Sequence, residues 1–590
     1  MQDRLFAATG HLINKGVSSC NRRDALAPCL VTAISYRKQK AVARNIHWQA
    51  ILAFLGSLLL IALLGHLTAG RTTVLVPAIG GRYSEALVGY PQHINPLLAR
   101  YGTPERDLCA LVFTGLTRAE ANGEILPDLS QAWEMSEDTL TYTFYLRQDV
   151  RWHDGVPFTA QDVAFTIGLI QSADFAGLPE LAAAWQDVET QTVDAYTVVF
   201  RLPQAYAPFL EQTTLGILPW HVLSGISPAE AYRHSFNQQP LGTGPFRLET
   251  LTAEYARLVP HAQFYGPRPY LNTLDFRFYS DATSALAAYD RGEVMGMGGI
   301  PPELLSRAAS QPHLNLFTSP LSGYTLVVLN NRRPIFADRH VRQALAYALD
   351  RQALIDGLLN GQGIVAHSPI MPGHWAYELN VQQYHHDIRQ AKRLLNRAEV
   401  QGSSYQSRRV RGDRFLAFTL LTDDDPIHQQ LATALAEQWS RLGARVTVET
   451  VPASVRDSYL YSYQFDAVLL EVALSADPDA YPWWHSTQAE GGQNFSGFSN
   501  FAADEALQQG RLITGRSQRW AFYRAFQQVF AKEVPAILLY HQVYMYGIAQ
   551  RIKNVQQGPL LEPSHRFRAI DRWYLVTQRV IVQQPPTPVP

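Results

Sequence analysis

Residues 125–167 read ILPDLSQAWEMSEDTLTYTFYLRQDVRWHDGVPFTAQDVAFTI, and this stretch decides the fold. Apolar side chains stand at positions 140, 142, 144 and 146, and this alternation predicts a half-buried strand over residues 139–147. Asp154-Gly155 is a turn signal. Thr159 is followed three residues later by Asp162, which predicts a helix that begins with a capping box. The stretch therefore predicts a strand, a tight turn and a helix in close succession.

The sequence on either side of this stretch alternates in the same way. FDAVLLEVAL (465–474) and PAILLYHQVYMYGI (535–548) are apolar runs of strand length, and TVLVPAIGG after Arg71 is a further strand candidate. HQQLATALAEQWSRLG (428–443) is a predicted helix that ends at Gly443 in a left-handed cap. Strands that alternate with helices predict an α/β protein with mostly parallel sheets.

Charge is unevenly distributed along the 590 residues. Residues 1–71 hold nine of the 50 Lys and Arg and two of the 51 Asp and Glu, so residues 72–590 hold 41 bases and 49 acids, a net charge of −8. Domains that bind nucleic acid are typically basic. The acidic body therefore argues against nucleic acid as a partner.

Reactive and metal-binding patterns are missing from the sequence. The three cysteines, Cys20, Cys29 and Cys109, include no CxxC spacing, and the body holds only one of them, so no disulfide framework is expected there. Neither a Ser/His/Asp arrangement nor an HExxH motif occurs. We therefore expect no cofactor, no metal and no catalysis.

Residues 48–65, WQAILAFLGSLLLIALLG, contain no charged side chain. About 20 apolar residues cross a bilayer as a helix, and the bases that precede the run predict that the body lies outside the cytoplasm. Residues 46–70 are therefore predicted to be a transmembrane anchor, or a long signal segment, that meets the membrane through residues 48–67. The run is longer than the apolar part of a typical signal peptide, which favours the anchor.

The segments that flank the apolar run and the end of the chain carry their own expectations. Residues 1–45 are expected to be a disordered, basic cytoplasmic leader, and residues 579–590 a Pro-rich tail. The residues before Arg71 resemble a bacterial lipoprotein box in which Arg71 stands where the lipidated cysteine would be. Thioether lipidation at this position is therefore excluded.

Four segments, in this order, resemble the family 5 extracellular solute-binding proteins, which are the dipeptide-, oligopeptide- and nickel-binding receptors of bacterial ABC importers. They are residues 125–167, LGTGPF at 241–246, NNRRPIFADRHVRQALAYALD at 330–350 and DPDAYPWWHS at 477–486. The resemblance covers about residues 72–578, and the first segment is its most specific part.

The resemblance implies an α/β fold of two lobes joined by a hinge, the type II-like periplasmic-binding-protein fold, with a subdomain inserted in the first lobe. It implies a first lobe from residues 72–118, 236–318 and 533–578, an inserted subdomain at 119–235, and a second lobe at 319–532. A ligand is expected between the lobes, which close over it.

The segment that begins at Asp477 is the strongest candidate for a binding site, because it follows the buried strand at 465–474, and open α/β sheets bind ligands at strand ends. Asp477 and Asp479 could hold a ligand ammonium group by charge-assisted hydrogen bonds. The aromatic walls of a pocket could come from Tyr481, Trp483 and Trp484.

The resemblance is incomplete at this segment. In the peptide-binding relatives an aspartate just ahead of an Asp-Pro pair binds the peptide ammonium, whereas residues 474–476 here are Leu-Ser-Ala. Asp477 is the nearest substitute, and the alternative is that Asp477 and Asp479 only shape the turn. The departure puts a peptide with a free amino terminus in doubt.

Three further residues are candidate ligand contacts. Tyr324 and Asn330 flank the predicted strand SGYTLVVLN, and Trp375 lies in the Pro/Gly-rich segment MPGHWAY, at positions that relatives use for side-chain pockets. Core packing is the alternative for each of them. Two other motifs are interpreted as structural: residues 152–155, WHDG, as core and turn, and the aspartates at 423–425 as a strand-end loop rather than a cation site.

These observations predict a monomeric, extracytoplasmic receptor, held at the membrane, that captures a peptide-like solute and delivers it to ABC permease subunits. Three alternatives stay open: a receptor for another solute, such as an oligosaccharide or a nickel chelate; a membrane-anchored ligand sensor; and an anchored hydrolase. The hydrolase lacks a nucleophile–base pair in the sequence.

Overall fold

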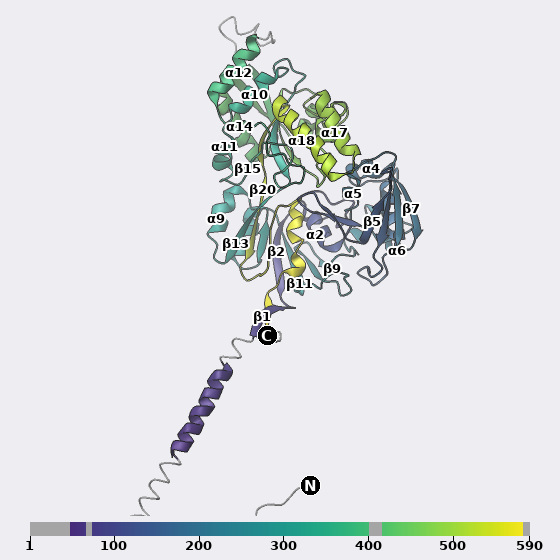
Figure 1. Ribbon diagram of the computed structural model, residues 1–590, viewed down its shortest axis with the longest axis vertical. Coiled ribbons are helices and arrows are strands. Elements are labelled where there is room, and N and C mark those ends of the chain that lie inside the picture. The colour runs from purple at the N-terminus through teal and green to yellow at the C-terminus, as the bar shows by residue number, and fades with distance from the viewer. Residues whose placement is uncertain (1–47, 67–72, 401–415, 582–590) are drawn as a thin grey trace, which may run out of the picture. The chain divides into compact units, whose positions relative to one another are not determined.

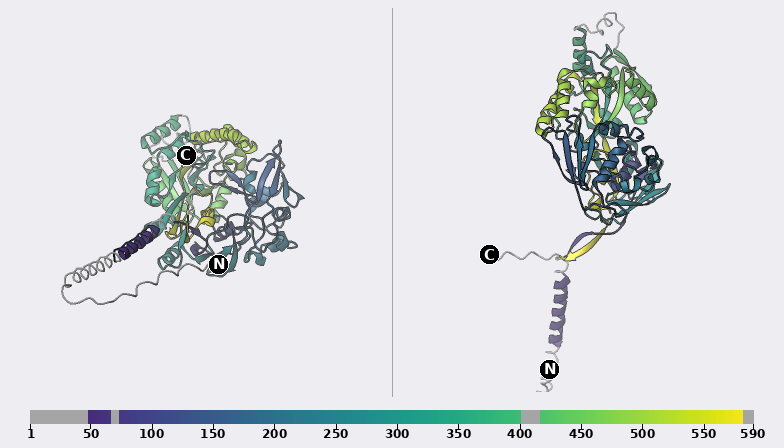
Figure 2. Two further views of the ribbon diagram at one scale, coloured as in Figure 1. Left: turned by 60° about the horizontal axis from the view of Figure 1, so that its bottom comes forward. Right: turned by 90° about the vertical axis from the view of Figure 1, so that its right-hand side faces the viewer.

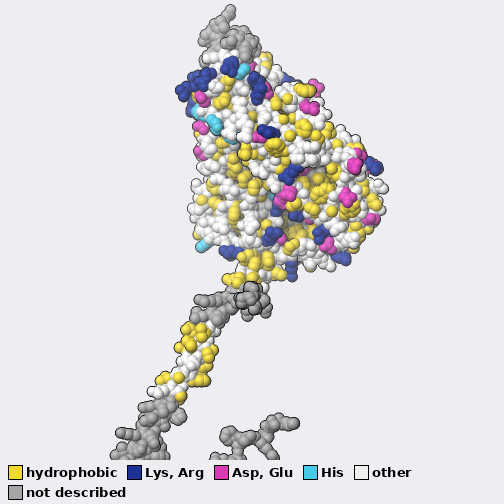
Figure 3. Space-filling model, viewed as in Figure 1, with side chains coloured by type: hydrophobic (Ala, Val, Ile, Leu, Met, Phe, Trp, Pro, Cys, Tyr) yellow, Lys and Arg dark blue, Asp and Glu magenta, His cyan; other side chains and the backbone are white. Residues whose placement is uncertain are grey.

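The computed structural model describes residues 48–66, 73–400 and 416–581 (Figure 1). The chain divides into two compact units, residues 1–76 with 578–590, and residues 77–577. The first unit contains the helix Trp48–His66, whose 19 residues are long and apolar enough to cross a membrane and whose side chains are exposed (Figure 3). Our expectations for residues 1–45, for Arg71 and for residues 582–590 lie outside the described residues.

A two-stranded sheet joins the beginning and the end of the described body. Strand β1 (Thr73–Ala78) is the predicted strand after Arg71, and it pairs with β21 (Val576–Ile581) (Figure 2). Residues 579–581, which were expected in the tail, therefore belong to a strand.

A seven-stranded sheet forms the core of the first α/β part of residues 77–577. Its strand order is β13-β20-β12-β2-β11-β10-β9. Tyr83 and Phe276 face α2 (Pro104–Val112) in a large apolar core, whereas Ala86 and Met297 face a smaller core beneath α8 (Ala282–Asp290) and α9 (Leu305–Ala309). The strands are β2 (Arg82–Val88), β9 (Phe246–Leu251), β10 (Tyr255–Pro260), β11 (Thr273–Tyr279), β12 (Gly296–Gly298), β13 (Leu314–Pro320) and β20 (Val543–Ala549).

The stretch at 125–167 builds most of a four-stranded antiparallel sheet and the helix that covers it. Alternate side chains of β6 (Thr141–Leu146) are buried, as the pattern predicts, and the capping box of Thr159 and Asp162 starts α3 (Ala160–Ile170). Trp152 is fully buried, and Gly155 adopts φ +90° in the turn. The other strands are β5 (Ser130–Met135), β7 (Glu189–Asp194) and β8 (Thr197–Arg201), and β3 (Thr117–Ala119) pairs with β4 (Ile125–Pro127) beside them.

A six-stranded sheet of order β15-β19-β14-β18-β16-β17 forms the second α/β part. Every residue of β14 (Gly323–Leu329) is buried, because both faces of the sheet are covered. Val327 and Leu329 face one core, and Leu326 and Val328 face the other, so the side chains alternate between two helical layers. The remaining strands are β15 (Ile364–Val365), β16 (Leu416–Thr422), β17 (Ala444–Thr450), β18 (Ala467–Ala473) and β19 (Ala536–His541).

Two groups of helices make these layers (Figure 1). The first consists of α10 (Arg339–Tyr347), α11 (Arg351–Leu358), α12 (Ile388–Val400) and α14 (Pro426–Ser440). The second contains α17 (Phe501–Leu512) and α18 (Arg516–Glu533). Gly443 has φ +93° shortly after α14, as predicted for its cap. The other helices are α4 (Pro179–Trp185), α5 (Phe209–Gln212), α6 (Trp220–Leu223), α7 (Pro228–Ala231), α15 (Ala453–Tyr461) and α16 (Tyr481–Trp484).

The expectation of mostly parallel sheets is wrong. Only β11–β2, β12–β2, β16–β17 and β16–β18 are parallel pairs in the two large sheets, and the other seven pairs are antiparallel. The reason is that β9 and β10 form a hairpin and that β14, β19 and β20 enter their sheets from connections between the two parts. A second difference concerns residue 533, where we expected the chain to return to the first lobe: β19 still pairs with β14, and the return follows His541.

The chain crosses between the two large sheets twice. Residues 320–323 connect β13 to β14, and residues 541–543 connect β19 to β20. The crossings lie side by side, because the backbone N–H of Leu321 donates to the carbonyl oxygen of Gln542 at 2.9 Å. The second α/β part is therefore one continuous segment of the chain.

Candidate functional site

Residues 474–485, which we call the strand-end loop, follow β18 and lie between the two α/β parts. Ala480 and Trp484 belong to a core of the second part, and Ala476 packs against Ala119 and Leu561. The loop also touches residues 206–211, which continue into the large core of the first part through Phe209. We call this contact of the loop with residues 119–125 and 206–211 the junction.

The two candidate aspartates are paired with arginines of the helices behind the loop. Both oxygens of Asp477 accept hydrogen bonds from Arg519 of α18, at 2.8 and 2.6 Å. Asp479 accepts two from Arg511 of α17, at 3.0 and 2.6 Å, and a third from the backbone N–H of Tyr481. These contacts support the interpretation that the aspartates shape the turn, because each carboxylate is already neutralised within its own lobe.

Burial and charge set the electrostatics of these pairs. Burial raises the pKa of Asp479, and Arg511 opposes that shift. Burial alone would lower the pKa of Arg519, but the attraction of Asp477 outweighs it and raises the pKa above the ordinary value. The Arg519–Asp477 pair is bidentate, which is the strongest geometry for a guanidinium with a carboxylate, whereas both Arg511 donors meet the same oxygen of Asp479.

The aromatic residues of the loop have different surroundings. Tyr481 stacks on His485 with ring centroids 4.0 Å apart, and the Arg511 guanidinium lies 3.9 Å from its ring centre. Trp483 is partly exposed and meets Phe495 edge-on, whereas Trp484 is buried against Phe530. Tyr481 and Trp483 therefore offer partly exposed aromatic surface, and Trp484 packs in the core.

Of the three candidates outside the loop, only Trp375 lies near the groups that hold it. Trp375 lies near Tyr523, with ring centroids 6.0 Å apart, and 5.5 Å from the Arg519 guanidinium. Tyr324 and Asn330 are each 1% exposed. Asn330 donates to the carbonyl oxygens of residues 463 and 465, and so ties two segments of the second lobe together.

Sequence reasoning missed a residue that holds the loop from the other side. The carboxylate of Glu211, in α5, accepts hydrogen bonds from the backbone N–H groups of Ala476 at 2.6 Å and of Asp477 at 2.9 Å. Burial and the nearby charges of Asp477 and Asp479 raise the pKa of Glu211 to about 7, although the two N–H groups oppose the shift. No local pattern marks a glutamate whose partner lies 265 residues away.

Other backbone contacts complete the junction. The N–H of Ala207 donates to the carbonyl of Arg511 at 2.8 Å, and the N–H of Trp375 donates to that of Asn122 at 3.3 Å. Gly123 has φ +81°, and a Cβ there would collide with the His374 ring and lie 2.8 Å from Cδ1 of Trp375. Glycine is therefore required where the β3–β4 turn meets the second lobe.

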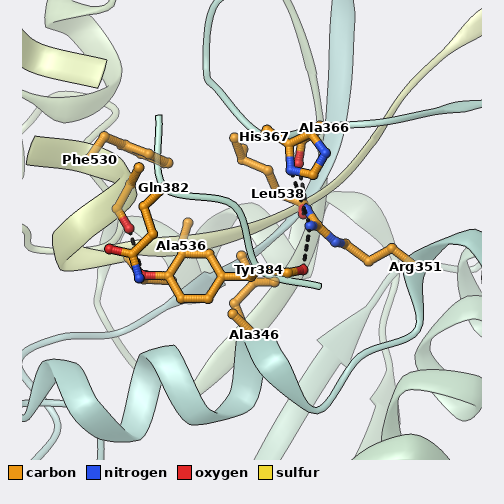
Figure 4. Close-up of a pocket in the computed structure, with 12 residues that line it drawn as sticks. Ala346, Arg351, Ala366, His367, Gln382, Tyr384, Phe530, Ala536 and Leu538 are labelled. Carbon is orange, nitrogen blue, oxygen red and sulfur yellow. Dashed lines mark hydrogen bonds between the residues drawn. The ribbon is translucent and has the colours of Figure 1, made fainter. Parts of the chain in front are cut away.

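A cavity of about 30 Å³ lies inside the second lobe rather than at the junction (Figure 4). Arg351 lines it and donates to the carbonyl oxygens of Ala366, Leu538 and Tyr384. Burial lowers the pKa of Arg351 to about 10 and that of His367 to about 4. The cavity has room for only about two or three water molecules, so it is too small for a peptide-sized solute.

The aspartates at 423–425 form a loop at the end of β16. Asp425 caps α14 by accepting the N–H groups of Ile427 and His428, and Asp423 pairs with Arg456 and with Nδ1 of His428, the latter at 2.7 Å. Burial alone would lower the pKa of His428, but its contacts with Glu471 and Asp423 outweigh burial and raise it to about 9. His428 is therefore a cation at neutral pH.

We expect His428→Gln to remove a stabilising contribution that depends on pH. Because the folded pKa is about 9 and the ordinary value is about 6.5, the contribution is complete below pH ~6.5 and is lost as the pH rises through about 9. The variant should be less stable than the wild type by about 1–2 kcal/mol at pH 6 and similar to it at pH 10. Urea unfolding from pH 6 to pH 10 measures the difference, with the exposed His385→Gln as control. The same pH profile in both variants would contradict the assignment.

Within the described ranges, no group of three or more His, Cys, Asp or Glu side chains is placed to hold a metal ion. Cys109 is buried, and burial raises the pKa of its thiol above the ordinary value.

Comparison with known proteins gives the same family across most of the chain. The family described as "Bacterial extracellular solute-binding proteins, family 5 Middle" matches residues 124–493. The oligopeptide-binding protein AppA of Bacillus subtilis is 26% identical over 511 residues, which cover 85% of this chain and 92% of AppA. The dipeptide-binding protein of Escherichia coli is 26% identical over 540 residues, covering 86% of this chain and 98% of that protein.

Comparison with solved structures leads to the same family. AppA in complex with a nonapeptide matches with a TM-score of 0.67 at 25% identity and covers 85% of this chain and 100% of AppA. NikZ of Campylobacter jejuni in complex with Ni(L-His) matches with a TM-score of 0.67 at 25% identity, covering 84% of this chain and 99% of NikZ. With two α/β parts, two crossings and the motif at 125–167 in place, the chain belongs to the bacterial extracellular solute-binding proteins of family 5.

Proposed function

We propose that this protein is the extracytoplasmic receptor of an ABC importer and that it binds a peptide-like solute between its two lobes. The observation that carries the proposal is the place of the strand-end loop. It leaves the carboxyl end of a buried strand and lies where the two α/β parts meet, which is where open α/β folds bind ligands. Relatives with related sequences over most of their length are oligopeptide- and dipeptide-binding proteins.

In this proposal residues 119–235 form the inserted subdomain and the two crossings form the hinge. Rotation about the crossings opens and closes the lobes. Ligand contacts come from the partly exposed side of the loop, with Tyr481 and Trp483 as apolar surface and with Asp477 and Asp479 holding the loop in shape. The ligand is then handed to permease subunits by opening of the lobes.

The helix Trp48–His66 supports a role at the membrane. It carries no charged side chain and is long enough to span a bilayer. We propose that it anchors the receptor and that the acidic body lies outside the cytoplasm as a monomer. N-terminal sequencing of the mature protein from membranes tests the anchor, and a new N-terminus after residue 66 would exclude it.

Binding is tested by isothermal titration of the full chain in detergent with three probes: a mixture of di- to nonapeptides, an oligosaccharide mixture and Ni(L-His). Heat from the peptides alone is the expected result. Heat from Ni(L-His) alone would favour the nickel-chelate alternative, which the similarity to NikZ keeps open. No heat from any probe would contradict the receptor function.

We expect Gly123→Ala to weaken ligand binding at least tenfold, while the left-handed backbone costs this variant and a matched Gly225→Ala variant a similar ~1–2 kcal/mol of stability. The added methyl group meets the rings of His374 and Trp375 across the junction and so opposes closure. Gly225→Ala is the matched control, because Gly225 has φ +87° and no neighbour within 4 Å. Equal affinities for the two variants would show that the contact at Gly123 does not affect closure.

A further inference from the structure

Glu211 is the third carboxylate that contacts the strand-end loop, after Asp477 and Asp479, and in the described part of the chain it lacks the arginine partner that the other two have. Asp477 is paired with Arg519 and Asp479 with Arg511. Among the residues that the structure describes, Glu211 has backbone N–H partners but no ion pair with Arg, Lys or His. When Glu211 is ionised, the group formed by Glu211, Asp477, Asp479, Arg511 and Arg519 therefore holds three negative charges and two positive ones.

This carboxylate connects two separate apolar cores. Its neighbour Phe209 is buried in the core of the first part, and the loop that it holds is anchored by Trp484 in a core of the second part. The covalent links between the two parts are the crossings at 320–323 and 541–543. In the lobe movement proposed above, a rotation about these crossings would separate Glu211 from the backbone N–H groups of Ala476 and Asp477.

Closing the lobes changes the surroundings of the Glu211 carboxyl group. In the open arrangement of the proposed movement the carboxyl group would face water, where a glutamate has a pKa of about 4.3. In the closed arrangement, burial and the charges of Asp477 and Asp479 raise the pKa to about 7. A group whose pKa is higher in one state binds protons more strongly in that state.

We propose that Glu211 positions the strand-end loop and that closure of the lobes is coupled to uptake of a proton at its carboxyl group. In the closed state the neutral acid removes the unbalanced negative charge of the junction. This inference rests on the lobe movement of the proposed function, but it does not depend on which ligand is bound.

The direction of the effect follows from the raised pKa. The closed state gains its full proton-linked stabilisation below the ordinary pKa and loses it as the pH rises through about 7. Burial lowers the pKa of His374 to about 4, so this imidazole stays neutral across that range. The charged or titratable groups that face Glu211 or pack around it are Tyr206 of its own segment, Asp477 and Asp479 of the loop, His374, Arg511 of α17 and Arg519 of α18.

Hydrogen exchange of the ligand-free full chain in detergent micelles, followed by mass spectrometry, tests the proposal. The reporters are the backbone amides of Ala207 and Trp375. Each donates across the junction to a backbone carbonyl group, and neither hydrogen bond involves Glu211. Their protection, corrected for the intrinsic pH dependence of exchange and compared with amides of β14, should fall about tenfold or more between pH 5.5 and pH 8.5.

Two variants distinguish an effect of protonation at Glu211 from a general effect of the substitution on the fold. Glu211→Gln cannot ionise, so its reporters should stay protected at a level that does not change with pH. Glu180→Gln removes an exposed carboxylate elsewhere in the same half of the chain and should behave as the wild type does.

Reporter protection that is constant with pH in the wild type would overturn the proposal, and so would a wild-type profile in Glu211→Gln. The wild-type profile alone decides the question if the variant does not fold. Because no ligand is present, a failure of peptide binding in the titrations above leaves this measurement unaffected.

Discussion

Replacing Arg566 by Met is expected to lower the free energy of unfolding by about 3–5 kcal/mol. Arg566 is 2% exposed, and its guanidinium donates to Glu85 at 2.9 Å and to both oxygens of Asp107 at 2.7 Å. Glu85 is fully buried and also accepts from the hydroxyl groups of Tyr83 and Tyr546. Removal of the arginine leaves two buried carboxylates without a counter-charge, which costs far more than the loss of a surface ion pair.

The loss should also depend on pH. Burial already raises the pKa of Glu85 and of Asp107, and Arg566 opposes both shifts. Without the arginine these carboxyl groups titrate at a higher pH in the folded state, so the variant is least affected in acid and its deficit grows as the pH rises. Thermal and urea unfolding at pH 5 and pH 8 measure this. Arg572→Met, at a side chain that is 70% exposed, is the control. A deficit below 1 kcal/mol at pH 8 would show that the triad is not a net stabilising feature.

Trp152→Ala is expected to cost about 3–5 kcal/mol, because it empties the centre of the core beneath the four-stranded sheet. Trp152 is fully buried, meets Phe158 with ring centroids 6.1 Å apart, and bonds through its backbone to residues 155 and 156 in the turn. The same change at Trp220, which is 43% exposed, should alter stability much less. Urea unfolding of both variants compares them, and equal losses would mean that Trp152 is not a core residue.

Local patterns predicted the elements well, and they failed for the partners of those elements. The alternation over 139–147 and the Thr159–Asp162 capping box are each formed by residues a few positions apart, so the local sequence is enough to predict them. Whether a strand pairs in parallel depends on segments hundreds of residues away, such as β20 beside β13 and β12. That information is not present in any window of the sequence.

The candidate site shows the same limit. The sequence predicts that Asp477 and Asp479 lie at a strand end, and the structure places both aspartates there. It does not indicate that Arg519 and Arg511 neutralise them, because these arginines lie 42 and 32 residues further along the chain and no local pattern links them to the aspartates. The place of Tyr324 and Asn330 near a strand predicts ligand contacts, but burial on both faces of the six-stranded sheet puts their side chains inside the lobe.

The position of β20 has a consequence for how the protein is made. β20 lies inside the seven-stranded sheet, between β13 and β12, yet it is the last strand of that sheet to leave the ribosome. At about 5–20 residues per second, the stretch of ~220 residues between β13 and β20 takes roughly 10–45 s to synthesise. The second lobe has all of its strands by His541, whereas the sheet of the first lobe still lacks the strand that joins its edge strand β13 to β12. The last part of the body to be translated is therefore the part that allows the first lobe to complete its folding.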